Sequence, residues 1–268
     1  MKKVESLDEI NRWIASFMKK GVLSNNYIMS DKYRSWIESG SLYYSLWEGA
    51  LIFFLDCGSY RRVYYHIKDG GVPIELPEDK PLAMELVYRS GSSSSGNSLD
   101  FWKTKGFKPY IYRLRMNCSA KALRNTGMEA NHVTYAGSRH AAAIQEMISS
   151  EFDPYLGCVP SLLEVEQYIK QEEIITVPDE RGGVAGVLHI GGKGATCFIW
   201  HLVVSPRERN KGVAKKLLAQ LGLLLQETDN AKIQLWVKRD NLSARGLYEK
   251  AGFEYDGWES TGLIAYPG

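Results

Sequence analysis

The sequence predicts an α/β protein of two domains, in which a mixed α+β sheet carries helices on both faces. Three observations support this fold class. Strand-like runs alternate with helix-like runs along the second half of the chain. A short pattern of aromatic residues and glycine occurs twice, in the same order and spacing. The length of 268 residues suits two domains, and 44% hydrophobic with 24% charged residues is a globular composition.

Charge and cysteine usage exclude several classes of function. The formal net charge of +2 gives no reason to expect nucleic acid or an anionic membrane as a partner. The four cysteines are far apart and the histidines are not clustered, so we expect buried thiols, no metal site and no disulfide framework. No run approaches the roughly 18 apolar residues of a membrane helix, and no apolar stretch follows the basic start. We therefore expect a cytoplasmic protein.

Helix caps and alternating runs define the first half. Ser6 and Glu9 form a capping box that starts a helix, which Gly21 ends. The serine-rich stretch 90–97 has the composition of a linker, yet it leads directly into aromatic residues. The other predicted elements are a helix at 31–40, a hairpin of 51–56 with 63–68, and strands at 82–89 and 110–116.

The repeated pattern links the two halves. Phe101-Trp102-x-x-x-Gly106-Phe107 has the same order and spacing as Leu247-Tyr248-x-x-x-Gly252-Phe253. In each case a predicted strand precedes the pattern and strand-like residues follow it. The first half therefore resembles a degenerate relative of the second, with a chance match of a short pattern as the alternative.

The second half begins after a connection at 117–131 that is rich in Asn, Lys, Gly and Ala. Ser161 and Glu164 form a further capping box. The predicted order is a strand at 132–136, a helix capped by Ser138, a loop at 152–157, a helix from the capping box to about residue 173, strands at 174–177, 184–190 and 197–204, a helix at 213–226, a strand at 232–237, a helix at 241–250, and strands near Phe253 and Leu263.

The turn between the strand ending at Val204 and the following helix is suited to an anion. A helix start leaves backbone N–H groups without intrahelical partners, and the helix dipole adds partial positive charge. Gly212 has no Cβ to hold a ligand away, and Arg209 and Lys211 add cations. A pyrophosphate fits these properties, although many α/β proteins have such a turn.

The spacing of residues in this turn is more specific. The pattern Val204-x-Pro206-x-x-Arg209-x-x-Gly212-x-Ala214 resembles the acyl-CoA pyrophosphate loop of the GNAT N-acetyltransferase superfamily. Further along, Asn241-x-x-Ala244-x-x-Leu247-Tyr248-x-x-x-Gly252-Phe253 resembles the second signature of that superfamily. The resemblance covers residues 130–268. Asn210 is a departure, since the family often has glycine there.

The resemblance and the repeat together imply a tandem member of the superfamily. Its domains would be residues 1–125, a degenerate and non-catalytic scaffold, and residues 126–268, an acetyltransferase domain that binds acyl-CoA. Between Lys68 and Pro81 there is no room for a strand, a phosphate loop and a helix. Trp102 stands where the second half has Tyr248, so the hydroxyl group is missing. We therefore expect the first half to bind no cofactor.

The resemblance implies acetyl-CoA as the co-substrate. Its pantetheine arm would pair with main-chain groups beside Leu202, Val203 and Val204, as an added strand does. Asn241 is the expected N-cap of its helix and a candidate for contact with the cofactor. The pyrophosphate would lie against the turn and the helix start, at Arg209, Asn210, Lys211, Gly212, Val213 and Ala214. Arg207 is a further candidate, and solvation by water is the alternative for each of these surface cations.

Acyl transfer from a thioester to an amine moves two protons, because the amine loses one and the departing thiolate gains one. The resemblance implies Tyr248 as the general acid, with simple core packing as the alternative. The base stays open between His201 and His189, on neighbouring strands, and either can be an ordinary packed residue. Glu151 and Asp153 lie where the family has its acceptor loop, and suit a cationic amine or only a solvated loop.

The sequence thus predicts an acyltransferase that moves an acetyl group from acetyl-CoA to a primary amine of a small molecule or peptide by direct attack. No serine or cysteine has an evident adjacent base, so a covalent acyl-enzyme has no support. The alternative function is a non-catalytic acyl-CoA-binding sensor or interaction module. The acceptor amine, the preferred acyl chain and any oligomer do not follow from the sequence.

Overall fold

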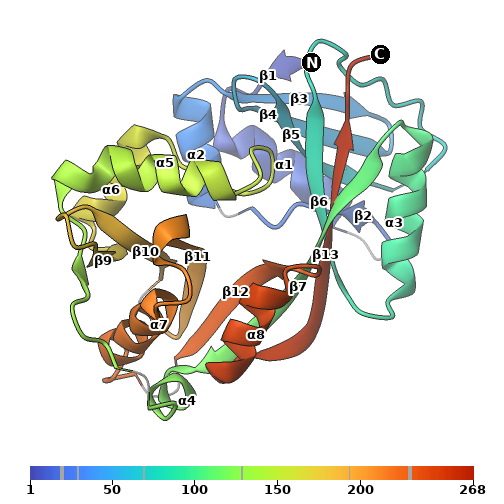
Figure 1. The fold of residues 1–268 in the computed structure, drawn as a ribbon. Helices are drawn as coiled ribbons and strands as arrows, with labels where there is room; N and C mark the ends of the chain where they lie inside the picture. The colour runs from blue at the N-terminus through green and yellow to red at the C-terminus, as the bar shows by residue number, and fades with distance from the viewer. Residues whose placement is uncertain (19–20, 29, 69, 128, 193, 229–230) are drawn as a thin grey trace. The chain divides into compact units, whose positions relative to one another are not determined.

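A computed structural model describes residues 1–18, 21–28, 30–68, 70–127, 129–192, 194–228 and 231–268 (Figure 1). The chain forms an N-terminal unit, Met1–Tyr112 with Glu259–Gly268, and a C-terminal unit, Arg113–Trp258. The division falls inside two long strands, β7 (Lys108–Ser119) and β13 (Glu254–Ala265). It differs from the sequence-based division between residues 125 and 126, because a boundary within a strand has no linker composition.

The N-terminal unit is a sheet with helices on both faces. Its helices are α1 (Leu7–Phe17), α2 (Ser30–Glu38) and α3 (Ser93–Thr104). Its strands are β1 (Lys2–Lys3), β2 (Leu23–Ser24), β3 (Leu42–Trp47), β4 (Ala50–Asp56), β5 (Arg61–Ile67) and β6 (Leu82–Arg89), with parts of β7 and β13. The strand order is β1-β3-β4-β5-β6-β13, and β2 pairs with β5.

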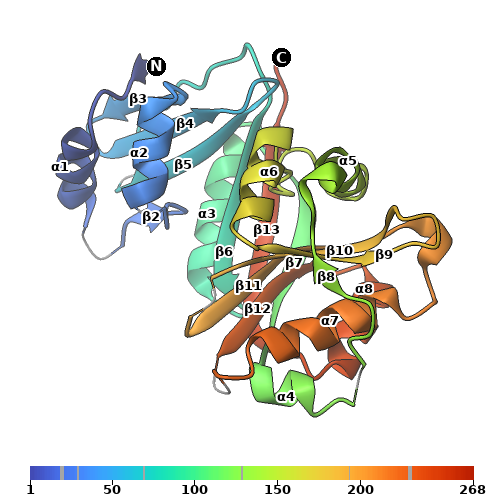
Figure 2. The same cartoon turned by 90° about the vertical axis from the view of Figure 1, so that its left-hand side faces the viewer.

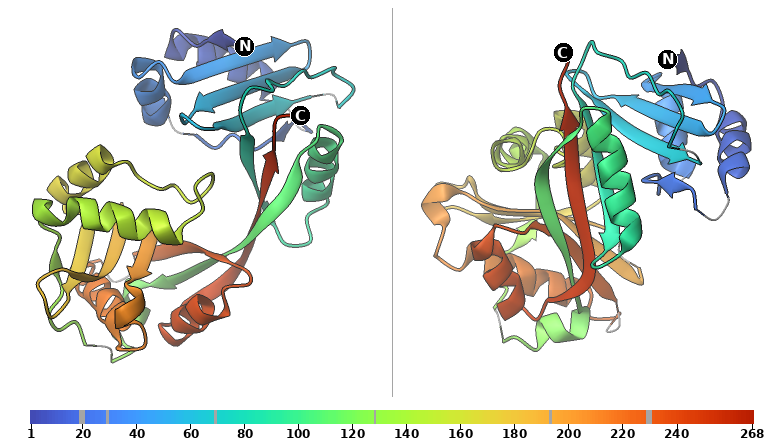
Figure 3. Two further views of the ribbon diagram at one scale, coloured as in Figure 1. Left: turned by 45° about the horizontal axis from the view of Figure 1, so that its top comes forward. Right: turned by 90° about the vertical axis from the view of Figure 1, so that its right-hand side faces the viewer.

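The sequence of β4 shows why helices cover both faces of this sheet. Successive side chains of a strand point to opposite faces. Phe53 packs with residues of α1 and α2, whereas Phe54 packs with Trp102 of α3. An uninterrupted apolar run therefore marks a strand between two helical layers. The predicted hairpin is confirmed as the antiparallel pair β4 and β5, and α3 lies along β6 (Figure 3).

The parallel strands β5 and β6 pair only at their beginnings. Arg61 pairs with Leu82 and Arg62 with Ala83, and the pairing extends no further among the described residues. Beyond these pairs, β2 lies along β5 and is antiparallel to it. β2 therefore pairs with part of the β5 edge that β6 leaves open.

The side chain of Asn25, directly after β2, fills the same opening. Its Oδ1 accepts a hydrogen bond from the N–H of Tyr65 at 2.8 Å, and its Nδ2 donates to the carbonyl oxygen of Val63 at 2.9 Å. The Nδ2 atom also donates to the carbonyl oxygen of Glu85 on β6 at 3.4 Å. Asn25 is buried. It thus satisfies backbone groups that parted strands leave without strand partners.

The C-terminal unit has a second mixed sheet. Its helices are α4 (Ala120–Arg124), α5 (Ala141–Glu151), α6 (Leu162–Lys170), α7 (Val213–Leu224) and α8 (Leu242–Lys250), with short 3₁₀ helices η1 (Ser138–His140) and η2 (Pro206–Glu208). Its strands are β8 (Thr134–Tyr135), β9 (Ile174–Pro178), β10 (Val184–Gly191), β11 (Thr196–Val204) and β12 (Lys232–Lys238), with parts of β7 and β13.

The strand order in this unit is β13-β7-β12-β11-β10-β9-β8, and β11 with β12 is a parallel pair. One face packs against α5 and α6, and the other against α4, α7 and α8 (Figure 2). Helices on both faces of a mixed sheet are what the sequence predicts. The capping box of Ser161 and Glu164 is also confirmed at the start of α6.

The repeated aromatic and glycine pattern has the same local structure in both units. The N–H of Phe107 donates to the carbonyl oxygen of Trp102 at 3.1 Å, and the N–H of Phe253 to that of Tyr248 at 2.9 Å. The ring centroids of the two pairs are 5.2 and 5.5 Å apart. The glycine before each phenylalanine has a positive φ, 86° and 85°. The sequence repeat is therefore also a repeat of structure.

Several expectations need correction. The two strands expected near Phe253 and Leu263 are one continuous strand, β13. Ser138 begins η1 and does not cap α5. Cys57 and Cys158 are exposed, whereas Cys118 and Cys197 are buried as expected; all four are free thiols. No helix in the part of the chain that the structure describes is long and apolar enough to cross a membrane.

Replacement of Asn25 tests the hydrogen bonds by which this side chain bridges β5 and β6. We expect Asn25→Ala to lower the free energy of unfolding by about 2 kcal/mol, because a buried N–H and a buried carbonyl lose their partner. Urea denaturation measures this change. Asn131→Ala, at an exposed position, is the control and should stay within about 0.5 kcal/mol of wild type. Equal stability of Asn25→Ala and wild type would show that the bridge contributes nothing.

Candidate functional site

The parallel strands β11 and β12 part toward their carboxyl ends. Their pairing runs from Thr196 opposite Lys232 to Ile199 opposite Leu235, and it extends no further among the residues that the structure describes. Both strands continue beyond these pairs. The edge of β11 that faces β12 therefore carries backbone groups that a neighbouring strand does not satisfy. An extended ligand can pair with such an edge.

A bulge in β11 lies where the strands begin to part. His189 and Ile190 are consecutive on β10, but they pair with His201 and Ile199, so Trp200 is an additional residue on β11. A bulge bends a strand and increases its local twist. It also shifts the alternation of side chains. Ile199 belongs to the core beneath α7, whereas His201 packs against the segment that follows α5.

The turn after β11 has backbone conformations that suit few residues. Asn210 has a φ of 64° and Gly212 a φ of 80°. Asparagine tolerates this left-handed region better than most residues, and glycine has no Cβ to clash. A Cβ on Gly212 would meet no atom within 4 Å, so the space beside it is open. Directly after this residue α7 begins, and its first N–H groups have no intrahelical partner.

A cavity of about 740 Å³ lies beside the parted strands, within the C-terminal unit. It brings together most of the residues that the sequence singled out. Those that line it are Leu202, Val203, Val204, Arg209, Asn210, Gly212, Val213, Ala214, Asn241 and Tyr248, with Glu151 at the end of α5 and Asp153 from the loop that follows. His201 and Lys211 do not line it.

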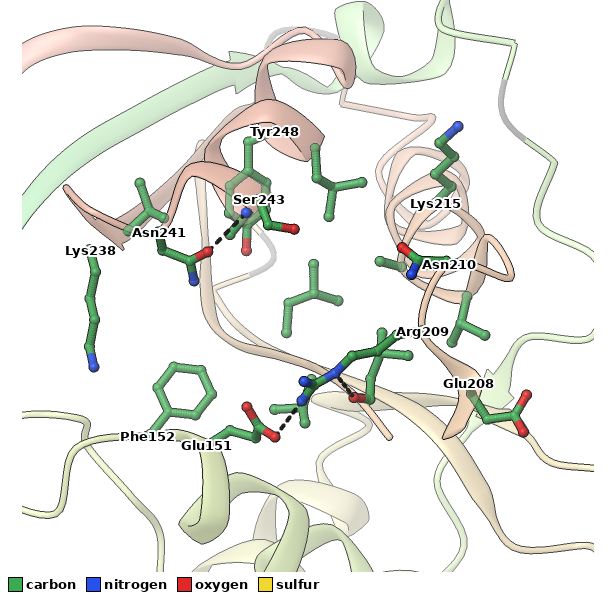
Figure 4. Close-up of a pocket in the computed structure, with 18 of the residues that line it drawn as sticks. Glu151, Phe152, Glu208, Arg209, Asn210, Lys215, Lys238, Asn241, Ser243 and Tyr248 are labelled. Carbon is green, nitrogen blue, oxygen red and sulfur yellow. Dashed lines mark hydrogen bonds and ion pairs between the residues drawn. The ribbon is translucent and has the colours of Figure 1, made fainter. Parts of the chain in front are cut away.

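Two ion pairs involve the cations of the turn. The Nη2 of Arg209 donates to Oε1 of Glu151 at the end of α5, and its Nε donates to the carbonyl oxygen of Val204 at 3.3 Å. The Nζ of Lys211 lies 3.2 Å from both carboxylate oxygens of Glu208. Figure 4 shows the Arg209 guanidinium directed across the cavity toward Glu151. Both cations therefore contact carboxylates.

Tyr248 lines the cavity from α8. It lies on the same helical face as Ala244, and Figure 4 shows its phenol oxygen directed into the cavity. Burial raises the pKa of Tyr248 above its usual value, so the hydroxyl stays protonated at neutral pH. Its ring also packs against Phe253. The side chain can thus donate a proton while it contributes to the core.

Asn241 holds the start of α8 in place. Its Oδ1 accepts a hydrogen bond from the N–H of Ala244 at 3.0 Å, which confirms the predicted N-cap. The residue also lines the cavity, opposite the turn that precedes α7 (Figure 4).

His201 is buried on the other face of β11. Its Nε2 lies 2.9 Å from the carbonyl oxygen of Gly157, and its Nδ1 lies 3.1 Å from Nδ1 of His189. A carbonyl oxygen only accepts, so Nε2 of His201 carries the proton. The neutral ring then accepts at Nδ1, and His189 donates from its own Nδ1. Both ring nitrogens of His201 have protein partners, which the sequence pattern did not reveal.

Burial controls the protonation of this histidine pair. It lowers the pKa of His189 to about 3, and the neighbouring His201 adds to the shift. Burial also lowers the pKa of His201, although the Gly157 carbonyl opposes this shift. Both rings are therefore neutral at pH 7. Their hydrogen bonds hold the loop that supplies Phe152 and Asp153 to the cavity.

The same loop has further supports. Oδ1 of Asp153 accepts hydrogen bonds from the N–H groups of Tyr155 and Leu156, at 3.1 and 2.7 Å. The buried Arg113 donates from Nη2 to the carbonyl oxygen of Leu156 at 2.9 Å. The loop backbone is thus held by the side chains of Asp153, Arg113 and His201, of which Arg113 comes from β7 and His201 from β11.

Sequence reasoning missed several residues that line the cavity. They are Arg113, Lys215, Trp236, Lys238 and Ser243. Lys238 and Trp236 lie at the carboxyl end of β12. Because the carboxyl ends of parallel strands meet at one edge of a sheet, recognition of β11 and β12 as parallel would have located them.

Comparisons with known proteins address the family. Residues 143–253 match the acetyltransferase (GNAT) family. This segment contains both sequence signatures, the parted strands and most of the cavity lining. The match supports the GNAT superfamily for the C-terminal unit, and acyl transfer as its general chemistry.

Solved structures of GNAT proteins have a similar fold. A GCN5-related N-acetyltransferase from Sphaerobacter thermophilus is 14% identical with a TM-score of 0.59, and the match covers 89% of this chain and 85% of that one. A GNAT-family acetyltransferase from Colwellia psychrerythraea is 12% identical with a TM-score of 0.59, over 99% and 98% of the chains. A tandem GNAT protein from the clavulanic acid biosynthesis pathway is 15% identical with a TM-score of 0.56, over 82% and 79%.

The buried histidine pair predicts a sensitivity to acid. Between pH 6.5 and about 3 the unfolded chain binds more protons at His189 than the folded protein does, so stability falls as pH falls through this window. The loss approaches about 1.4 kcal/mol per pH unit for one such histidine. His189→Asn keeps a donor for His201 but removes this titration. Its unfolding free energy, measured in urea at pH 7 and pH 5, should fall less steeply than that of wild type. An equal fall of the unfolding free energy with pH in the two proteins would contradict the lowered pKa of His189.

Proposed function

We propose that the C-terminal unit transfers an acetyl group from acetyl-CoA to a primary amine of a small molecule or peptide. One observation carries the proposal. The cavity beside the parted strands is lined both by the turn at the start of α7 and by Tyr248, within the segment that matches the GNAT family. An anion site, an open strand edge and a proton donor then lie around one space.

In this proposal the cofactor lies along the turn and the strand edge. The N–H groups at the start of α7, with Gly212 leaving space beside them, face the pyrophosphate. Arg209 and Lys215 supply positive charge at the same end of the cavity. The backbone of β11 from Leu202 to Val204 pairs with the pantetheine arm, as an added strand would.

The reaction is a direct attack of the amine on the thioester carbonyl. A carbon–nitrogen bond forms, the carbon–sulfur bond breaks, the amine gives up a proton and the coenzyme thiolate takes one. Tyr248 donates the proton to the thiolate, since its hydroxyl faces the cavity and stays protonated. We do not assign His201 as the base, because its two ring nitrogens are hydrogen-bonded to Gly157 and His189. The proton of the amine leaves to solvent in the cavity.

The N-terminal unit is a non-catalytic relative of the C-terminal unit in this proposal, so that the chain is a tandem GNAT protein. The repeat of local structure around Trp102 and Tyr248 supports the kinship. In the N-terminal unit, β2 and Asn25 fill the opening between β5 and β6, where a cofactor would need a free strand edge. We therefore expect one coenzyme site per chain.

A second candidate function is a non-catalytic acyl-CoA sensor. It is favoured by the burial of both strand histidines away from the cavity. Thiol release from acetyl-CoA separates the two, with polyamines, aminoglycosides, amino acids and peptides as a panel of acceptors. Amine-dependent release supports the enzyme, whereas coenzyme binding without release on any amine supports the sensor.

Replacement of Gly212 tests the coenzyme site. Gly212→Asp should abolish CoA binding in calorimetric titration, because it places a carboxylate beside the phosphates and strains a positive φ. Gly182→Asp is a matched control: its φ is 78°, the space around it is also open, and it lies between β9 and β10. The control should bind CoA as wild type does. Wild-type affinity in Gly212→Asp would mean that the turn is misassigned.

Replacement of Tyr248 tests the proton donor. Tyr248→Phe should lower kcat by roughly 100-fold and leave the affinity for CoA nearly unchanged, because the hydroxyl acts in the transition state. Steady-state thiol release and calorimetry measure the two quantities. Tyr266→Phe, at an exposed position, should retain wild-type turnover. Near-normal turnover of Tyr248→Phe would assign this side chain to packing alone.

A further inference from the structure

The Arg209 guanidinium forms contacts that a bound diphosphate would displace. It donates from Nη2 to Glu151 and from Nε to the carbonyl oxygen of Val204. Val204 is the last residue of the strand that parts from β12. The side chains of Arg209 and Glu151 are 48% and 38% exposed, so neither is fixed by burial. Figure 4 shows the guanidinium lying between the turn and the end of α5.

Phosphates bound at the start of α7 would attract this guanidinium. Arg209 directly precedes the left-handed residues that lead into α7. The helix start offers N–H groups and partial positive charge, and a guanidinium adds paired donors for phosphate oxygens. The carboxylate of Glu151 would compete with the phosphate for those donors. The ion pair is solvent-exposed and weak, so exchange of its partner costs little.

The other carboxylates of the cavity have different partners. Asp153 accepts from the N–H groups of Tyr155 and Leu156, and Glu208 contacts Lys211. Among the described residues that line the cavity, Glu151 is the carboxylate that pairs with Arg209. Loss of Arg209 to a phosphate would leave the Glu151 carboxylate at the cavity wall, next to Phe152.

We propose that Glu151 and the diphosphate of the cofactor exchange places on Arg209. This inference rests on the proposed function and adds a role for Glu151. Without cofactor, Glu151 holds the guanidinium and lowers the affinity for coenzyme. With cofactor bound, the released carboxylate binds the ammonium group of the acceptor amine. Cofactor therefore raises the affinity for a cationic amine, and by linkage the amine raises the affinity for cofactor.

A double-mutant cycle with coenzyme A as the probe tests the exchange. Glu151→Gln should tighten CoA binding by about 2- to 5-fold in calorimetry, because an exposed ion pair no longer competes. In the Arg209→Gln background the same substitution should have no effect, since the shared partner is absent. Glu208→Gln is the matched control. It removes a cavity carboxylate paired with Lys211, and its effect should be the same with and without Arg209.

The outcomes are separable. Equal tightening of CoA binding by Glu151→Gln in both backgrounds would mean a general charge effect and would overturn the exchange. An unchanged CoA affinity of Glu151→Gln in the protein that retains Arg209 would also overturn it. For the amine of the panel with the highest turnover, Glu151→Gln should raise KM by 10-fold or more, on the order of one lost charge-assisted contact, with a smaller change in kcat. An unchanged KM would overturn the ammonium contact. If wild type does not bind CoA, the proposed function fails, whereas normal CoA binding with a flat cycle removes the exchange alone.

Discussion

The opening between β11 and β12 is the constraint on which the C-terminal unit depends. Parallel strands that stay paired satisfy each other's backbone groups, and strands that part must find other partners. The bulge at Trp200 bends β11 at the start of this opening. The turn into α7 lies on one side of the opening and α8 on the other, so both motifs reach the same cavity. The position of the proposed chemistry thus follows from hydrogen bonds that the sheet does not form.

Each unit has an opening between two parallel strands, and different groups border the two openings. In the N-terminal unit the pairing of β5 with β6 ends after Arg62 and Ala83, and β2 with Asn25 then satisfies the free edge. In the C-terminal unit the corresponding edge borders a cavity. A buried polar side chain that bonds to both strands stabilises a sheet but occupies the place of a ligand. This contrast gives a physical reason for the proposal that the N-terminal unit is a scaffold and the C-terminal unit binds a cofactor.

Much of the fold was predictable because it depends on local patterns. The predicted capping boxes located the starts of α1 and α6, although at α1 the Ser6 side chain accepts from the N–H of Glu9 while the Glu9 carboxylate accepts from the N–H of Glu5. Apolar periodicity located the central strands and α7. The residues of the turn and of α8 were found because they are contiguous in sequence. The partners of His201 could not be predicted, because the bulge at Trp200 and the contact with Gly157 on a distant loop leave no local signal. The Arg209 and Glu151 pair joins residues far apart in sequence, so it too required the structure.

The strand β13 makes the completion of the N-terminal unit depend on a late part of the chain. Its residues from Glu259 onward belong to that unit, and Leu263 is fully buried in its core beside Trp102. During synthesis on the ribosome, the whole of Arg113–Trp258 emerges before this segment does. Until then β6 keeps an exposed edge, which is a site for mispairing with other chains. The N-terminal sheet can therefore be completed only after β13 has been synthesised.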